Sequence, residues 1–133
     1  KRQALHDAAM QILAETKLQP QAEKLAGALT LSDRKRLEVA RALGTNPSLL
    51  LLDEVMAGLT PTEVSAVLNT IRHLQHERGL SIVMVEHVVR ALLTLSDRIV
   101  VLHHGELIAD GTPSDIAADP AVRAVYFGEA PAA

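Results

Sequence analysis

Four consecutive leucines, Leu49 to Leu52, followed by Asp53 and Glu54, constrain the fold of this chain more than any other feature. An uninterrupted apolar run with turn residues before it is typical of a strand buried on both faces of a parallel sheet. Two further β-rich runs cover residues 80–86 and 97–103, with segments of helical period between the three runs. This alternation of strands and helices predicts an α/β fold with a parallel sheet flanked by helices.

Helices are expected between and beyond these strands. Thr60, Pro61 and Glu63 form a capping-box pattern, and Thr30 or Ser32 is suited to cap an earlier helix. The apolar spacing and the caps predict helices over residues 2–16, 20–28, 30–43, 60–79, 88–95, the segment opened by Thr112, and 120–127. His104 and Gly105 predict a tight turn that leads into residues 106–110.

Composition excludes several classes of function. The 133 residues include no cysteine, which removes disulfide frameworks, thiolate zinc sites and cysteine nucleophiles. Tyr126 and Phe127 are the only aromatic residues, too few for a platform that stacks nucleic-acid bases. Residues 1–47 carry eight Lys/Arg against five Asp/Glu, and the remainder five against eleven, so we expect no nucleic-acid partner. The sequence contains no membrane-spanning stretch and no signal peptide, and predicts a cytoplasmic chain.

Three groups of residues are suited to catalysis or to ligand binding. Asp53 and Glu54 follow a predicted buried strand, where a carboxylate can hold Mg²⁺ through water and a second can polarise an attacking water. His87 follows the next strand and can donate to a phosphate oxygen. A capped helix start near Thr30 is suited to an anion. Read singly, each also fits solvated carboxylates, an exposed histidine or a helix start without a ligand.

The order of these segments resembles the C-terminal half of the ATPase subunit of an ABC transporter, a P-loop NTPase. The resemblance rests on residues 36–43, 49–54, 57–61 and the pair Glu86-His87. Asp53 matches the Walker B aspartate, Glu54 the catalytic glutamate, and His87 the switch histidine. Gly58 lies in the D-loop match, and Thr30, Leu31, Ser32 and Asp33 fall in a degenerate ABC signature. Residues 96–102, 105, 109–113 and 121–129 are similar to the branched-chain amino acid group, which also includes urea importers.

The resemblance implies a division into a helical, signature-bearing part over residues 1–47 and the C-terminal part of a RecA-like ATPase core over 48–133. It implies ATP and Mg²⁺ as cofactors of a full-length parent, with Mg²⁺ positioned by Asp53, water oriented by Glu54 and the γ-phosphate sensed by His87. Thr30 would reach the ATP of a second ATPase subunit. Hydrolysis would power transmembrane permease subunits that import branched-chain amino acids or related small solutes, from the inner face of the plasma membrane.

Departures from the family pattern define further expectations. No Gly-x-x-x-x-Gly-Lys-Ser/Thr sequence is present, so we expect the chain alone neither to bind ATP tightly nor to hydrolyse it. Ser32 and Asp33 replace the usual signature Gly and Gln, with Arg34 available to offset the carboxylate. Val55 replaces the proline that commonly follows the Walker B glutamate, with a mild expected effect. The alternative function is a truncated, non-catalytic assembly or regulatory module.

The missing part of the family pattern also has a structural consequence. In the family, the Walker A strand separates the strand that leads to His87 from the strand over residues 98–103. Its absence predicts a gap in the sheet, unpaired strand edges and self-association. We therefore expect the chain to be part of a longer parent.

Overall fold

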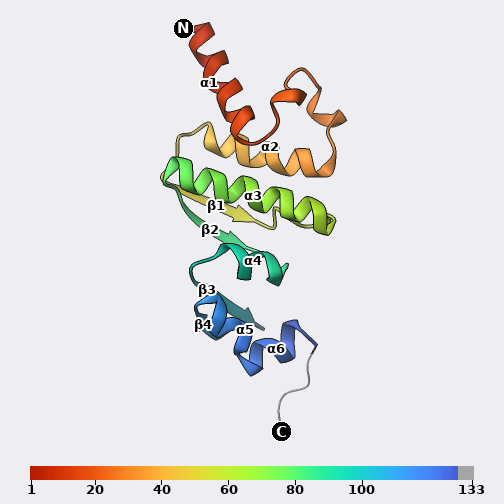
Figure 1. Ribbon diagram of the computed structural model, residues 1–133, viewed down its shortest axis with the longest axis vertical. Helices are drawn as coiled ribbons and strands as arrows, with labels where there is room; N and C mark the ends of the chain where they lie inside the picture. Colours follow the sequence, from red (N-terminus) through yellow and green to blue (C-terminus); the bar gives the residue numbers. More distant parts are fainter. Residues whose placement is uncertain (129–133) are drawn as a thin grey trace. The chain divides into compact units, whose positions relative to one another are not determined.

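A computed structural model describes residues 1–128 and shows helices and strands in the expected α/β order (Figure 1). The elements are α1 (Arg2–Glu15), η1 (Gln19–Gln21), η2 (Ala26–Ala28), α2 (Leu31–Leu43), β1 (Leu49–Asp53), α3 (Pro61–Arg78), β2 (Ser81–Val85), α4 (Val89–Leu95), β3 (Ile99–His103), β4 (Glu106–Gly111), α5 (Pro113–Ala118) and α6 (Pro120–Tyr126). Glu129, the last residue of the tail that resembles the branched-chain amino acid group, lies outside the described residues.

The chain divides into two compact units, the first from Lys1 to His87 and the second beginning at Val88. The expected boundary between residues 47 and 48 falls inside the first unit. That expected division follows family subdomains rather than compactness, and it stays a prediction. None of the helices within residues 1–128 has the length and apolar character needed to cross a membrane.

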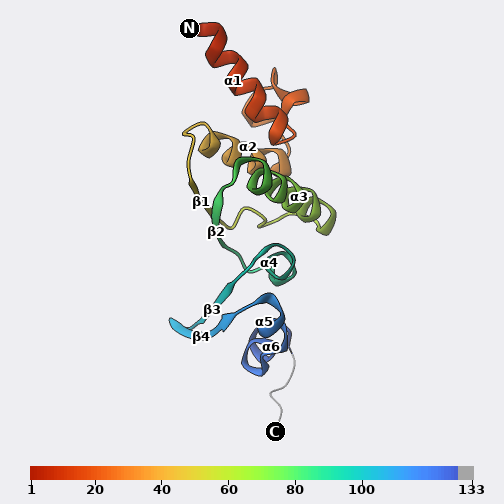
Figure 2. The same ribbon diagram turned by 60° about the vertical axis from the view of Figure 1, so that its left-hand side comes forward.

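The first unit is built on a parallel pair of strands. β1 and β2 pair in a register that aligns Leu49 with Ser81 and Asp53 with Val85. Helices α2 and α3 lie on the same side of this pair (Figures 1 and 2). Because both strands run in the same direction, their carboxyl ends lie at one edge, and the residues that follow them meet there.

The leucine run is covered on one face only. Leu50 and Leu52 are 3% and 5% exposed, whereas Leu49 and Leu51 are 49% and 69% exposed. The prediction of burial on both faces is therefore wrong for this structure. The physical reason is that, within residues 1–128, α2 and α3 cover one side of this strand pair and leave Leu49 and Leu51 exposed on the other.

Local capping fixes the helices of the first unit. Thr60 and Glu63 form the predicted capping box of α3, and Gly79 ends that helix in the left-handed conformation at φ 61°. At the far end of α3, Arg78 Nε donates to Glu15 Oε2 at 2.6 Å and so ties α3 to the end of α1. The same hydrogen bond, with the positive charge of Arg78, holds the pKa of Glu15 below its usual value.

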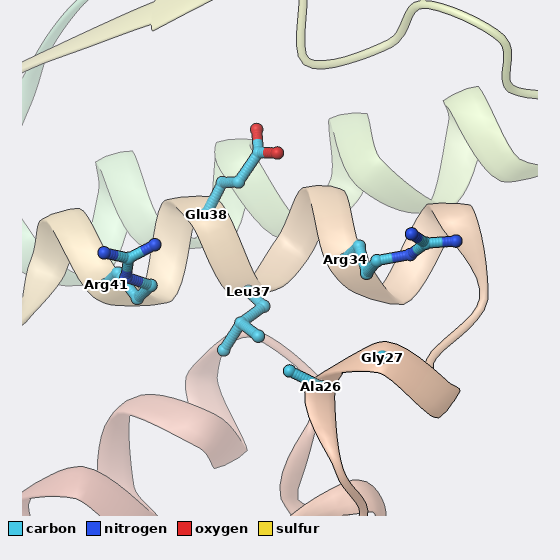
Figure 3. A pocket seen from close by; sticks show the side chains of 6 residues that line it. All are labelled: Ala26, Gly27, Arg34, Leu37, Glu38 and Arg41. Carbon is cyan, nitrogen blue, oxygen red and sulfur yellow. The ribbon is translucent and has the colours of Figure 1, made fainter.

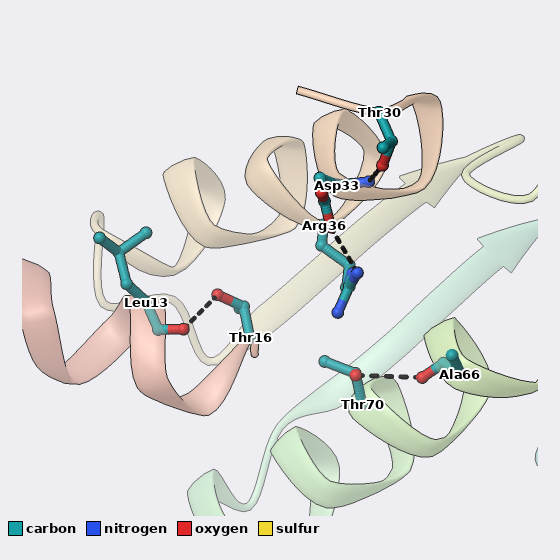
Figure 4. Close-up of polar contacts among 7 residues, drawn as sticks. All are labelled: Leu13, Thr16, Thr30, Asp33, Arg36, Ala66 and Thr70. Atoms are coloured by element: carbon teal, nitrogen blue, oxygen red, sulfur yellow. Dashed lines mark hydrogen bonds and ion pairs between the residues drawn. The ribbon is translucent and has the colours of Figure 1, made fainter. Parts of the chain in front are cut away.

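Two threonines lie fully inside the first unit without leaving a hydroxyl unpaired. Thr16 is 0% exposed and donates to the carbonyls of Ile12 and Leu13, and Thr70 is 4% exposed and donates to the carbonyl of Ala66 (Figure 4). These bonds satisfy groups that would otherwise be costly to bury.

The segment over residues 20–28 differs from its prediction as one helix. It forms two short 3₁₀ helices, η1 and η2, and neither contains a buried residue. The segment therefore has no apolar stripe to pack against the core, and short isolated α-helices need such packing. Single 3₁₀ turns are the usual outcome in connecting segments of this kind.

The second unit contains an antiparallel hairpin. β3 and β4 are joined by a tight turn in which His104 and Gly105 have φ of 49° and 78°, as expected for a two-residue hairpin loop. Its core consists of Ile99, Val101, Ile116 and Val122, with partly buried apolar side chains of α4 and β4 around them. This hairpin is a two-stranded sheet of its own, and the expected gap beside the strand over residues 98–103 stays a prediction.

Candidate functional site

Three of the predicted site residues gather at the carboxyl edge of the β1–β2 pair. Asp53 is the last residue of β1, Glu54 follows it, and His87 lies two residues beyond the end of β2. All three are exposed. This edge is where open α/β sheets bind their ligands. The parallel pairing brings the residues together although 33 positions separate Glu54 from His87 in the sequence.

Glu54 and His87 face each other directly. Glu54 Oε1 lies 3.7 Å from His87 Nδ1, and the two side chains are 57% and 63% exposed. The separation is too long for a hydrogen bond, so the pair attracts only when the imidazole is protonated. Glu54 adopts a left-handed backbone conformation with φ 50°, which is uncommon for a residue with a side chain. The carboxylate is thus presented at a sharp exit from the strand.

The turn that follows Glu54 is anchored to β2. Glu54 N–H donates to the carbonyl of Val85 at 2.8 Å and so continues the strand pairing by one residue. Met56 N–H donates to Glu86 Oε1 at 2.9 Å. Glu86 and Met56 were not among the predicted site residues. Because their bond joins positions 30 residues apart, no local pattern in the sequence indicates it.

The residues matched to the signature form the start of α2. Thr30 is the N-cap, and its hydroxyl oxygen accepts from Asp33 N–H at 3.1 Å, which leaves the hydroxyl proton for another acceptor. Leu31 is exposed, whereas Ser32 and Asp33 are 6% and 9% exposed. The buried side chain of Ser32 therefore occupies space within the unit rather than on its surface.

Asp33 is neutralised by a different arginine from the expected one. Arg36 Nη2 lies 2.5 Å from Asp33 Oδ1, one helical turn along α2 (Figure 4). Arg34, which the sequence analysis offered as the partner, is exposed and lines a surface cavity instead. The spacing of three residues puts Arg36 on the face of Asp33, whereas adjacent residues on a helix diverge.

Gly58 joins the turn to the signature segment. It has φ 78°, and a Cβ atom placed on it would lie 3.1 Å from Leu31 Cδ2. A side chain at this position would both strain the backbone and crowd Leu31. The turn after Glu54 is therefore in contact with both β2 and the start of α2.

The donor set fits Mg²⁺ only together with a ligand that brings its own oxygens. Within residues 1–128, no three His, Asp or Glu side chains cluster closely enough to hold a metal by themselves. Asp53 offers one exposed carboxylate at the strand edge. Mg²⁺ commonly takes one or two carboxylates and completes its shell with water and phosphate oxygens, which agrees with this single donor.

A surface cavity of about 280 Å³ lies between η2 and α2 (Figure 3). Its lining consists of Ala26, Gly27, Arg34, Leu37, Glu38 and Arg41. None of the predicted site residues lines it. The predicted chemistry therefore lies at an open strand edge and not in this cavity.

Comparison with known families and proteins gives consistent matches. Residues 106–132 match the family model described as "Branched-chain amino acid ATP-binding cassette transporter". The chain is 39% identical over 118 residues to the high-affinity branched-chain amino acid transport ATP-binding protein BraF of Pseudomonas aeruginosa, covering 89% of this chain and 46% of BraF. It is 37% identical over 123 residues to the lipopolysaccharide export system ATP-binding protein LptB of Escherichia coli, covering 92% and 51%.

Solved structures give the same fold. The ADP conformation of MJ1267, an ATP-binding cassette of an ABC transporter, superposes with a TM-score of 0.84 at 30% identity, covering 95% of this chain and 51% of that one. A nucleotide-free ATP-binding cassette superposes with a TM-score of 0.83 at 29% identity, covering the same shares. The chain spans about half the length of the curated relatives it matches.

Proposed function

Since this chain belongs to the ABC ATPase family and corresponds to the C-terminal portion of its ATP-binding subunits, we propose that it supplies the water-activating edge of an ATP-hydrolysing transport subunit. The observation that carries the proposal is the meeting of Asp53, Glu54 and His87 at the ends of two adjacent parallel strands. The similarity to ATP-binding transport proteins over most of the chain supports it. It does not favour the alternative of a non-catalytic assembly or regulatory module.

Each residue at the edge has a separate task in this proposal. ATP would supply the γ-phosphoryl group, and Mg²⁺ would supply positive charge beside the phosphate oxygens. Asp53 would hold the metal ion. Glu54 orients the attacking water and accepts its proton as a general base. His87, 3.7 Å from Glu54, lies where its imidazole can donate to a phosphate oxygen.

The second ATP-contacting surface lies at the start of α2. Thr30 keeps a hydroxyl proton after it caps the helix, and it is exposed. We assign Thr30, Leu31, Ser32 and Asp33 to contact the ATP of a second ATPase subunit, with Gly58 in the turn at that interface. The chain itself has no phosphate-cradling glycine-rich loop with a lysine, so it neither binds ATP tightly nor hydrolyses it in isolation.

The proposed solutes are branched-chain amino acids or related small solutes. The match of residues 106–132 to a branched-chain amino acid cassette model supports this class. The identity to BraF supports it as well. LptB, a protein of an export system, is nearly as similar, so identity over the strand edge does not separate solute classes. The proposed partners are transmembrane permease subunits, which would hold the protein at the inner face of the plasma membrane.

The test uses the natural gene product that carries these residues, reconstituted with its permease subunits in lipid vesicles. Phosphate release and uptake of labelled leucine and urea are measured for the unchanged protein, for Glu54→Gln and for Glu23→Gln, a substitution at an exposed glutamate on a connecting segment. We expect Glu54→Gln to lower the turnover number by about 100-fold or more. Glu23→Gln should leave it unchanged. Full turnover in Glu54→Gln, or none in the unchanged protein, would refute the proposal.

A further inference from the structure

Three successive residues at the end of β2 contact the exit from β1. The carbonyl of Val85 accepts from Glu54 N–H, and His87 faces the Glu54 carboxylate at 3.7 Å. Between them, Glu86 Oε1 accepts from Met56 N–H at 2.9 Å. The bond of Val85 is ordinary strand pairing, and His87 belongs to the proposed reaction. The side chain of Glu86 is therefore the one whose role is not yet assigned.

The contact of Glu86 is made to a buried part of the turn. Val55 and Met56 are 3% and 1% exposed, so the turn is anchored inside the unit immediately after the exposed Glu54. A buried amide that finds no acceptor is costly, and the turn geometry gives Met56 N–H no strand partner. The carboxylate of Glu86 supplies that acceptor as a charge-assisted hydrogen bond.

The position of this bond matters because Glu54 is held in an unfavourable conformation. Its φ of 50° lies in the left-handed region, where a residue with a side chain persists only if its surroundings determine it. The Val85 carbonyl fixes Glu54 from one side. Glu86 fixes the chain two residues later. Together the two hydrogen bonds hold the backbone at Glu54 and two residues after it.

The second carboxylate oxygen of Glu86 adds no further hydrogen bond to the turn. Glu86 Oε2 is buried and has no hydrogen-bond partner among the described residues. Burial of an acceptor without a partner lowers stability. Glu86 thus departs from the rule that buried polar atoms have hydrogen-bond partners. Residues that depart from this rule are concentrated at functional sites.

We infer that Glu86 is a positioning residue, whose hydrogen bond to Met56 N–H holds the turn after β1 so that the Glu54 carboxylate stays beside His87. Glu86 acts through the backbone and touches no phosphate or water of the reaction. The effect of Glu86 on turnover rests on the function proposed above. The hydrogen bond between Glu86 and Met56 does not depend on that function. Loss of the bond should therefore disturb Glu54 without disturbing the binding of ATP.

The first experiment measures the hydrogen bond without any nucleotide. Amide hydrogen exchange of Met56 is followed by NMR in the natural gene product and in Glu86→Ala, Glu86→Gln and Glu23→Gln. We expect Glu86→Ala to speed exchange at Met56 by about tenfold, the size of one lost hydrogen bond. Glu86→Gln retains an acceptor oxygen and should keep the protection, as should Glu23→Gln. Unchanged exchange in Glu86→Ala, or equal loss in the alanine and glutamine variants, would overturn the inference.

The second experiment separates positioning from folding and from the proposed function. In the reconstituted transporter, Glu86→Ala should lower kcat while KM for ATP stays within about twofold, and Glu86→Gln should restore most of kcat. Glu86→Asp, which is too short to reach Met56, provides a second variant if the alanine variant does not fold. An equal change of kcat and KM would overturn the positioning role. Absence of ATP hydrolysis in the unchanged protein would instead refute the proposed function, and the exchange at Met56 would still decide whether the bond exists.

Discussion

Leu51 on β1 and Val83 on β2 are register partners on the uncovered face of the parallel strand pair, and they are 69% and 54% exposed. Leu49 and Val85 extend the same face, at 49% and 59% exposed. Contiguous apolar side chains of this kind are rare on the surface of a monomer and mark surfaces that other chains cover. The neighbouring strand edges also offer unpaired backbone groups.

The 133-residue chain should therefore self-associate. Light scattering at increasing concentration should give a mass above the 14.3 kDa of one chain. The double substitution Leu51→Thr with Val83→Thr should return it toward the monomer, because threonine is well tolerated in strands and removes apolar surface. Leu5→Thr, at another 69% exposed leucine on α1, is the matched control. A monomer at high concentration would contradict the prediction.

The ion pair of Glu15 and Arg78 should make stability depend on pH. Arg78 lowers the pKa of Glu15 in the folded chain below the ordinary value of 4.5. The stabilisation is therefore complete above pH 4.5 and is lost as the pH falls through the lower, folded value. In urea titrations, Glu15→Gln should cost about 0.5 kcal/mol at pH 7, a magnitude typical of partly exposed pairs.

The difference between Glu15→Gln and the unchanged chain should shrink when the titrations are repeated at pH 3. Glu23→Gln, at an exposed carboxylate, should show no such trend. The more exposed pair of Arg98 and Asp110, with side chains 70% and 35% exposed, should contribute less than the Glu15 pair. A constant difference between pH 7 and pH 3 would show that the ion pair does not stabilise the fold.

Gly58→Ala should destabilise the first unit. The position requires φ 78°, and the added methyl group would lie 3.1 Å from Leu31 Cδ2. We expect a loss of about 1–2 kcal/mol in the free energy of unfolding, measured by urea titration. Gly27→Ala is the control, because its Cβ would meet no atom within 4 Å. Equal stabilities of the two variants would show that Gly58 is not constrained.

Restoring the usual signature residues should raise activity and lower stability. Ser32→Gly with Asp33→Gln, made in the natural gene product, should increase ATP turnover of the assembled transporter because the backbone can approach phosphate more closely without a nearby carboxylate. Arg36 would lose its charged partner, at a cost of about 0.5 kcal/mol, as for the Glu15–Arg78 pair of similar exposure. Unchanged turnover would show that these two positions do not limit the site.

Local patterns predicted what local chemistry determines. The caps at Thr30, Thr60 and Thr112 are present because a side-chain oxygen and an amide three residues later decide them. Asp53, Glu54 and His87 were each expected where a parallel strand ends, and the two strands end at one edge, where Glu54 lies 3.7 Å from His87. These predictions needed only the order of the segments and the pairing rules of the backbone.

Predictions that depended on partners elsewhere in the fold were less successful. The leucine run indicated a strand that can be buried on both faces. The sequence does not say whether other elements pack against both of them. The bond of Glu86 to Met56 depends on the exact path of a turn. The pairing of Asp33 with Arg36 was within reach, because a spacing of three on a helix favours that contact over one with Arg34.

Helix α3 has a mechanical consequence for the unit that contains it. It begins at Pro61, a few residues after Met56, which Glu86 contacts, and its last residue, Arg78, donates to Glu15 at the end of α1. Its 18 residues span about 27 Å at 1.5 Å per residue. Because the Arg78–Glu15 hydrogen bond ties the end of α3 to α1, one continuous helix joins the region of the strand edge to the N-terminal helix of the unit.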